Sequence, residues 1–137
     1  MFTITETTRR VLVADDEPVI RKLVTCALEP EGFNAVIATD GREASRILQT
    51  DADFKGAIFD MMMPNLKGLD VIRYMRTEKR LMLIPAMMIS SEQDLKLMSD
   101  SFAAGAVLFL PKPFTQDQLH TTLRMLLKRQ NPVSRAA

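Results

Sequence analysis

The sequence predicts an α/β fold: a five-stranded parallel sheet, doubly wound with five helices, in the flavodoxin-like strand order 2-1-3-4-5. Two observations predict it. Short apolar runs alternate five times with longer segments whose apolar residues recur at helical spacing. The runs are nearly continuous in apolar character, which is typical of strands buried on both faces. Short connections between such elements require right-handed crossovers and a sheet covered on both sides.

The apolar runs define the expected strands and the segments between them define the expected helices. Strands are predicted at about 10–14, 34–38, 56–60, 84–89 and 105–110. Helical spacing of apolar residues marks Val19–Leu28, Ala44–Leu48, Leu69–Met75, Leu95–Phe102 and Leu119–Leu127.

Several helix ends carry their own signals. Pro30 with Gly32 is expected to close the first helix, and Gly105 the fourth. Thr115, followed three residues later by Gln118, is a capping pair that predicts the start of the fifth helix.

Length and composition bound the function. The chain has 137 residues, of which 47% are hydrophobic, so one folded domain is expected. We expect that domain over 10–129, between flexible segments at 1–9 and 130–137. The net charge of +1 supplies no basic field, so direct nucleic-acid binding is not expected. The longest apolar stretch contains Pro85 and is too short for membrane insertion, and no signal peptide is recognised; a cytoplasmic location follows. The single cysteine, Cys26, is expected to be a core thiol.

Polar residues stand where the apolar runs stop. Asp15 and Asp16 follow the first run, Asp60 ends the third, Ser90 ends the fourth and Lys112 follows the fifth. The carboxyl ends of parallel strands share one edge, which is where ligands bind in such sheets. Three carboxylates and an ammonium at that edge favour a site for Mg²⁺ and a phosphoryl group.

Each of these residues also has an ordinary structural interpretation when taken alone. Asp15 and Asp16 could be solvated acids at a helix N-terminus, where negative charge is favourable. Ser90 could cap a helix and Lys112 could be a surface lysine. Asp60 is harder to explain in this way, because turn chemistry suits Pro64 but not a carboxylate at the end of a buried strand. The joint pattern therefore favours a site.

Four motifs give the chain a close resemblance to a known family. They read V-L-V-A-D-D-E-P at 11–18, F-D-M-M-M-P at 59–64, M-I-S-S at 88–91 and F-L-P-K-P-F at 109–114. In this order and spacing they resemble the receiver domain of bacterial two-component response regulators, of the single-domain, chemotaxis-regulator-like kind. The resemblance runs from about residue 10 to residue 128.

The resemblance implies a phosphoacceptor function. Asp60 would take a phosphoryl group from a sensor histidine kinase or a histidine phosphotransfer protein. Mg²⁺ would be bound directly by Asp16, Asp60 and the backbone carbonyl of Met62, and by Asp15 through a water. Such a protein is a signalling phosphoacceptor that assists only its own phosphorylation and dephosphorylation, and is not otherwise an enzyme.

The resemblance also implies how a signal would leave the site. Ser90 and Lys112 would contact the phosphoryl group. Ser90 would then move inward and let Phe109 rotate, changing an output face formed by the fourth helix, fifth strand and fifth helix. Met62 and Glu92 would flank the phosphoryl group and tune its lifetime. The bond between Lys112 and Pro113 would be cis. If residues 1–137 are the whole product, the protein acts through a partner protein.

Two other classes remain open at this point. A metal-dependent aspartyl-phosphate phosphatase would use similar acids, but it needs a second aspartate two residues beyond the nucleophile, where this chain has Met62. A flavin- or nucleotide-binding module on the same fold needs a loop rich in Gly, Ser or Thr after the first strand. The loop here is Asp15–Pro18, which would repel a phosphate unless a metal intervened.

Overall fold

The computed structural model describes residues 9–91 and 95–128. The expected flexible ends, Arg9 apart, and Glu92 lie outside this described part. The elements in chain order are β1 Arg10–Ala14, α1 Pro18–Leu28, the 3₁₀ helix η1 Glu29–Glu31, β2 Asn34–Ala38, α2 Gly41–Thr50, β3 Gly56–Asp60, α3 Gly68–Thr77, β4 Ala86–Ser90, α4 Leu95–Ala104, β5 Leu108–Pro111 and α5 Gln116–Lys128.

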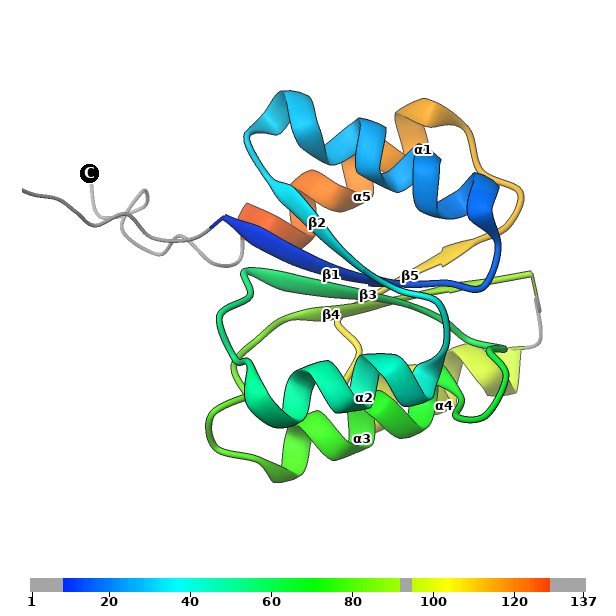
Figure 1. Cartoon of the computed structure of the whole chain (residues 1–137). Helices are drawn as coiled ribbons and strands as arrows, with labels where there is room; N and C mark the ends of the chain where they lie inside the picture. The colour runs from blue at the N-terminus through cyan, green and yellow to red at the C-terminus, as the bar shows by residue number, and fades with distance from the viewer. Residues whose placement is uncertain (1–8, 92–94, 129–137) are drawn as a thin grey trace, which may run out of the picture.

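The five strands form one parallel sheet in the order β2-β1-β3-β4-β5, which confirms the predicted topology. Helices α1 and α5 cover one face, and α2, α3 and α4 cover the other (Figure 1). All strands run in the same direction, so their carboxyl ends lie along a single edge. The fold therefore brings together the residues that follow β1, β3, β4 and β5.

Alternate residues along the strands contribute to two separate hydrophobic cores, one on each face of the sheet. On β1, Leu12 and Ala14 pack toward α2, α3 and α4, whereas Val11 and Val13 pack toward α1 and α5. On β3, Phe59 contributes to the first core in the same alternating manner. Burial on both faces explains why the central strands read as continuous apolar runs. The sheet therefore has an apolar core on each face.

The prediction that every strand is buried on both faces is wrong for the sheet edges. β1, β3 and β4 are almost wholly buried, but β2 is an edge strand in which Asn34 and Ile37 are exposed. β5, at the other edge, is only partly buried. An edge strand has a neighbour on one side only, and less of the covering helices reaches it.

Two strands also begin later than their apolar runs predict. β4 begins at Ala86 rather than at 84, because the amide of Ile84 is used in a turn, bonding to the carbonyl of Leu81. β5 begins at Leu108 rather than at 105, because the amide of Ala106 bonds back to Ser101 at the end of α4. Both apolar segments are therefore loops packed on the core.

The predicted helix ends are confirmed where a capping residue signalled them. The amide of Thr115 donates to Gln118 Oε1 at 2.9 Å, and the amide of Gln118 donates to Thr115 Oγ1 at 3.0 Å. This reciprocal pair starts α5. Gly32 follows η1 with φ +86°, and Gly105 follows α4 with φ +122°, both in a region that favours glycine.

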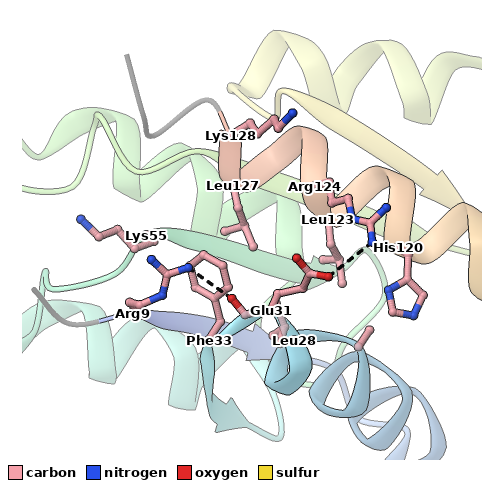
Figure 2. A pocket seen from close by; sticks show the side chains of 11 residues that line it. Arg9, Leu28, Glu31, Phe33, Lys55, His120, Leu123, Arg124, Leu127 and Lys128 are labelled. Atoms are coloured by element: carbon pink, nitrogen blue, oxygen red, sulfur yellow. Dashed lines mark hydrogen bonds and ion pairs between the residues drawn. The ribbon is translucent and has the colours of Figure 1, made fainter. Parts of the chain in front are cut away.

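The expectation that Cys26 is a core thiol is wrong, because its side chain is exposed on α1. It borders a small hollow lined also by Leu23, Phe114 and Leu119. A larger hollow lies between α1 and α5 near the start of the strands, and Figure 2 shows its lining.

Candidate functional site

The predicted site residues lie at the carboxyl edge of the sheet. Asp15 and Asp16 follow β1, Asp60 is the last residue of β3, Ser90 is the last of β4, and Lys112 follows β5. The peptide bond between Lys112 and Pro113 is cis, as the resemblance implied. Four segments remote in sequence therefore meet at one place.

Three carboxylates form the acidic part of this site. Asp15, Asp16 and Asp60 each offer one oxygen, and these oxygens lie within 4.8 Å of one another. Asp15 is 1% exposed and Asp60 5%, whereas Asp16 is exposed. Such close carboxylates repel one another unless a cation or proton intervenes.

The bonding of Asp15 tests whether this cluster fits a metal ion. Its Oδ1 accepts a hydrogen bond from the amide of Glu17 at 2.8 Å. Its Oδ2 is buried and accepts no hydrogen bond from the described part of the chain. This buried oxygen contacts the ammonium of Lys112 at 3.4 Å and lies within reach of two other carboxylates, so it is available as a hard ligand for Mg²⁺. The donor set therefore fits.

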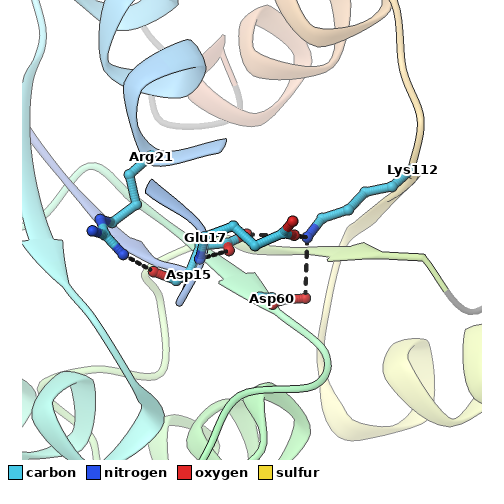
Figure 3. Close-up of polar contacts among 5 residues, drawn as sticks. All are labelled: Asp15, Glu17, Arg21, Asp60 and Lys112. Atoms are coloured by element: carbon cyan, nitrogen blue, oxygen red, sulfur yellow. Dashed lines mark hydrogen bonds and ion pairs between the residues drawn. The ribbon is translucent and has the colours of Figure 1, made fainter. Parts of the chain in front are cut away.

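Lys112 supplies the positive charge, and Figure 3 shows its ammonium between the three acids that it contacts. Its Nζ lies 3.6 Å from Asp60 Oδ1 and 3.4 Å from Asp15 Oδ2. It also donates a short hydrogen bond to Glu17 Oε1. In this state the ammonium is thus shared among three carboxylates.

Glu17 is the site residue that the sequence interpretation missed. It occupies the N-cap position of α1, but its side chain does not cap the helix and turns to Lys112 instead. The available signal was its place in the acidic run after β1, at the same edge as Lys112. Arg21, one turn further along α1, donates to the backbone carbonyl of Asp15 at 2.7 Å and ties the β1–α1 turn to the helix (Figure 3).

Burial and mutual repulsion shift the ionisation of these groups. Burial, followed by the charge of Asp15, raises the pKa of Asp60 to about 7, with Lys112 acting in the opposite direction. Burial also raises the pKa of Asp15. Burial alone would lower the pKa of Lys112, but the hydrogen bond to Glu17 and the neighbouring carboxylates outweigh it, and the pKa is raised. Without a bound metal ion, the negative charge on Asp15 and Asp60 is therefore disfavoured.

Ser90 and Phe109 lie on adjacent strands beside this cluster. Ser90 is fully buried, and its backbone carbonyl accepts a hydrogen bond from the amide of Lys112 at 2.7 Å. Phe109 pairs in register with Met88 and is half-buried against the core under α2, α3 and α4. Their switch role stays a prediction.

The loop after β3 carries the remaining predicted residue, Met62. Met61 and Met63 are buried in the core, whereas Met62 is 49% exposed. The backbone amide of Met62 bonds to Asp60 and favours its ionised form. The loop is tied to the start of α2, where Asn65 Nδ2 donates to Asp40 Oδ2 at 2.8 Å. The tuning roles of Met62 and of Glu92 stay predictions.

A 2-1-3-4-5 parallel sheet with three carboxylates and a lysine at its carboxyl edge defines a signal-receiving domain of the chemotaxis-regulator type. The chain belongs to the response regulator receiver domain family, whose family model matches residues 11–124. Domains of this family act in two-component signalling, interact with histidine kinases or phosphotransfer proteins, and use Mg²⁺ at an acidic pocket.

Named relatives and solved structures agree with this assignment. The chain is 32% identical over 123 residues to the response regulator MprA of Mycolicibacterium vanbaalenii, covering 90% of this chain and 52% of that protein. It is 33% identical over 128 residues to the alkaline phosphatase synthesis transcriptional regulatory protein SphR of Synechococcus elongatus, covering 88% and 49%. The chain therefore spans about half the length of these curated relatives.

Among solved structures, the chemotaxis response regulator CheY4 of Vibrio cholerae superimposes with a TM-score of 0.80 and 31% identity. The similarity covers 88% of this chain and 100% of that one. Within the described residues, no helix combines the length and apolar character needed to cross a bilayer.

Proposed function

We propose that Asp60 is the residue that accepts a phosphoryl group from a histidine kinase or a histidine phosphotransfer protein. The observation that carries the proposal is the position of its carboxylate: 5% exposed, at the end of a central strand, with Asp15, Asp16 and Lys112 around it. A carboxylate with a purely structural role does not require two further acids beside it. A phosphoacceptor carboxylate does, because those acids bind the cation that neutralises charge during the transfer.

The proposed transfer is a displacement of imidazole at phosphorus. One oxygen of Asp60 attacks the phosphorus of a phosphohistidine, a P–O bond forms, and the P–N bond to the imidazole breaks. The released imidazole keeps the bonding electron pair and takes up a proton. Lys112 Nζ, 3.6 Å from Asp60 Oδ1, then gains a negatively charged oxygen as a partner and releases Glu17.

Asp15, Asp16 and Asp60 are the residues that would hold Mg²⁺, with the carbonyl of Met62 as a further ligand and a water between the ion and Asp15. When bound, the ion neutralises charge on the phosphoryl oxygens and on the carboxylates. The buried Oδ2 of Asp15, which accepts no hydrogen bond within the described residues and contacts Lys112 only as an ion pair, supports this assignment. It also leaves direct ligation by Asp15 available, besides contact through a water.

The signal would pass through Ser90 and Phe109 to the face formed by α4, β5 and α5. Support comes from large apolar side chains exposed on these helices: Leu95 and Phe102 on α4, and Met125 on α5. Exposed apolar groups on a signalling domain are suited to docking a protein partner. The partner would be an output protein, without direct nucleic-acid contact by this domain.

The domain would act as a signalling phosphoacceptor rather than as a catalyst with turnover. Receiver domains are generally not enzymes, and the residue two positions beyond Asp60 is the half-exposed Met62 rather than the second aspartate of a phosphatase. A nucleotide-binding loop is equally unsupported, because the turn after β1 is acidic. Incubation with a small phosphomonoester and Mg²⁺ should release no phosphate above the background rate.

Intact-mass spectrometry tests the phosphoacceptor. Incubation with acetyl phosphate and Mg²⁺ should add the mass of one phosphoryl group, and Asp60→Asn should abolish the gain while leaving the fold intact. Asp53→Asn, which removes an exposed carboxylate near the opposite edge of the sheet, is the matched control and should retain it. A phosphoryl mass retained by Asp60→Asn would overturn the assignment.

A further inference from the structure

A hollow of about 560 Å³ lies between α5 and the end of α1, at the edge of the sheet where the strands begin. Arg9 lies just before β1 and Lys55 just before β3, and both line it. β3 runs from this edge to Asp60, which at about 3.3 Å per residue places the hollow on the order of 16 Å from the phosphoacceptor. The hollow is therefore separate from the acidic site.

The floor of this hollow is apolar. Leu28 from α1 and Leu123 from α5 are buried there, and Phe33 and Leu127 are partly buried against the same core. Figure 2 shows these apolar side chains between the two groups of polar residues. An aromatic or branched hydrocarbon group entering the hollow would bury its surface against them.

The rim is cationic. Arg9, Lys55, Arg124 and Lys128 surround the floor, and Glu31 is the one carboxylate among the lining residues. This is an unusual concentration for a chain with a net charge of +1.

The lone carboxylate does not neutralise the rim. Glu31 Oε2 is paired with Arg124 at 3.4 Å. Arg9 donates instead to the backbone carbonyls of Gly32 and Glu31, at 3.0 and 3.2 Å, and its guanidinium stacks 4.2 Å from the centre of the Phe33 ring. Within the described part of the chain, Lys55 and Lys128 form no ion pair. The hollow thus keeps a surplus of positive charge beside an apolar floor.

We propose that this hollow is a binding site for a small amphipathic anion, with a compact aromatic body and one carboxylate. The floor would receive the aromatic body, and Lys55 and Lys128 would swing their flexible side chains toward the carboxylate. The size falls within the range of small-molecule sites. A long polyanion would need a basic surface more extended than this rim.

The test compares three probes on the complete chain by two-dimensional amide NMR. 2-Naphthoate carries both features, 2-naphthylmethanol lacks the charge, and acetate lacks the aromatic body. Naphthoate should give saturable shifts confined to the residues around Arg9, Lys55 and the 120–128 part of α5. Its affinity should exceed that of the alcohol about ten-fold or more, and fall with added salt. Acetate should give no saturable shift.

Charge reversal supplies the decisive control. Lys55→Glu with Lys128→Glu should weaken naphthoate about ten-fold or more. Lys22→Glu with Lys79→Glu makes the same change in net charge at exposed positions outside the hollow, and should leave the affinity within about two-fold. The inference is overturned if shifts centre elsewhere, if the alcohol binds as well as the acid, or if the two double variants behave alike.

Discussion

The ammonium of Lys112 is shared among three carboxylates of the described residues. The Lys112 side chain is 12% exposed, and its ammonium lies among Asp15, Glu17 and Asp60. Only Glu17, whose side chain is 57% exposed, can withdraw to solvent without leaving a buried charge behind. The resting site therefore holds its lysine by an acid that is easily displaced when a phosphoryl oxygen arrives.

Replacing that acid should speed phosphorylation. Glu17→Gln removes the charge that competes for Lys112, and it also lessens repulsion of an incoming anionic phosphodonor. An exposed ion pair contributes about 0.2–1 kcal/mol, so the rate with acetyl phosphate should rise about 1.5- to 5-fold. Glu29→Gln removes the same charge at the far end of α1 and should leave the rate unchanged. Intact-mass measurements at timed intervals give the rate of phosphorylation. A lower rate in Glu17→Gln than in the unaltered protein would show that Glu17 assists the transfer.

Met62 is expected to set how long the phosphoryl group survives. Its side chain is half-exposed on the loop that follows Asp60, and a thioether is a poor partner for a hydrolytic water. Met62→Asn should speed loss of the phosphoryl group, because an amide can hold a water in line. Glu92→Ala should change the decay less.

The decay of the phosphorylated species, followed by intact mass after removal of the donor, measures both effects. Met82→Asn is the matched control: Met82 is 46% exposed, in the loop before β4 at the opposite edge of the sheet. An unchanged or slower decay in Met62→Asn would show that its side chain does not shield the site.

At the scale of elements, helix and strand identities follow from the sequence, but strand ends and edge character do not. The apolar run that begins at 84 satisfies the pattern of a strand, yet the amide of Ile84 bonds within a turn. The predicted strand order places β2 at the sheet edge, but its apolar run does not show that this position exposes Ile37. The turn at Ile84 depends on local backbone torsions, which the apolar pattern does not specify.

The functional site, too, could be predicted only in part from the sequence. Residue type and strand position predicted that Asp15, Asp16, Asp60 and Lys112 would meet at one edge, and they do. The hydrogen bond from Lys112 to Glu17 depends on side-chain torsions in the turn after β1. Local pattern carries no information on such torsions.

The contact between the start of α2 and the loop after β3 should tolerate no added side chain. A Cβ on Gly41 would lie 1.8 Å from the carbonyl oxygen of Leu66, so the backbone of the loop must move. Gly41→Ala should lower the free energy of unfolding by about 1–3 kcal/mol, the usual cost of overpacking. It should also slow phosphorylation, because the displaced loop carries Met62 and follows Asp60.

Urea denaturation measures the first effect and acetyl phosphate labelling the second. Ser45→Ala, on the same helix and without a clash of this kind, is the control and should change the free energy of unfolding by less than about 0.5 kcal/mol. Equal stability of Gly41→Ala and the unaltered protein would show that the loop yields without cost.

At the scale of the whole molecule, the acidic site should oppose folding when no cation is bound. The pKa of Asp60 is raised from 3.8 to about 7, and that of Asp15 is also raised. A carboxyl group with a raised folded-state pKa binds more protons in the folded than in the unfolded protein between these values. Its contribution to stability is therefore present below about pH 4 and is lost as the pH rises through about 7.

In EDTA, the free energy of unfolding should consequently fall between about pH 4 and 7 through this group. Asp60→Asn should remove most of that dependence and stabilise the metal-free protein at pH 8 by on the order of 4 kcal/mol, at about 1.4 kcal/mol per pKa unit between 3.8 and about 7. Asp53→Asn should not. Urea titrations at several pH values measure this, and parallel curves for Asp60→Asn and the unaltered protein would contradict it.

Mg²⁺ should restore this lost stability, because the bound ion neutralises the charge of the carboxylates in the folded protein. At about 100 times its dissociation constant it should add about 2.7 kcal/mol near pH 8, and Asp16→Ala should remove most of this response. If Mg²⁺ leaves the melting temperature of the unaltered protein unchanged, that result would argue against a metal site.

The exposure of Cys26 has a practical consequence for following this protein at work. It is the single thiol of the chain, and it stands on α1 at the rim of the hollow that Phe114 and Leu119 also line. A maleimide dye would therefore attach at one known position without any engineered residue. Its emission would depend on whether water or another protein covers the α1–α5 side, so the dye would report in real time whether a phosphodonor docks on that side.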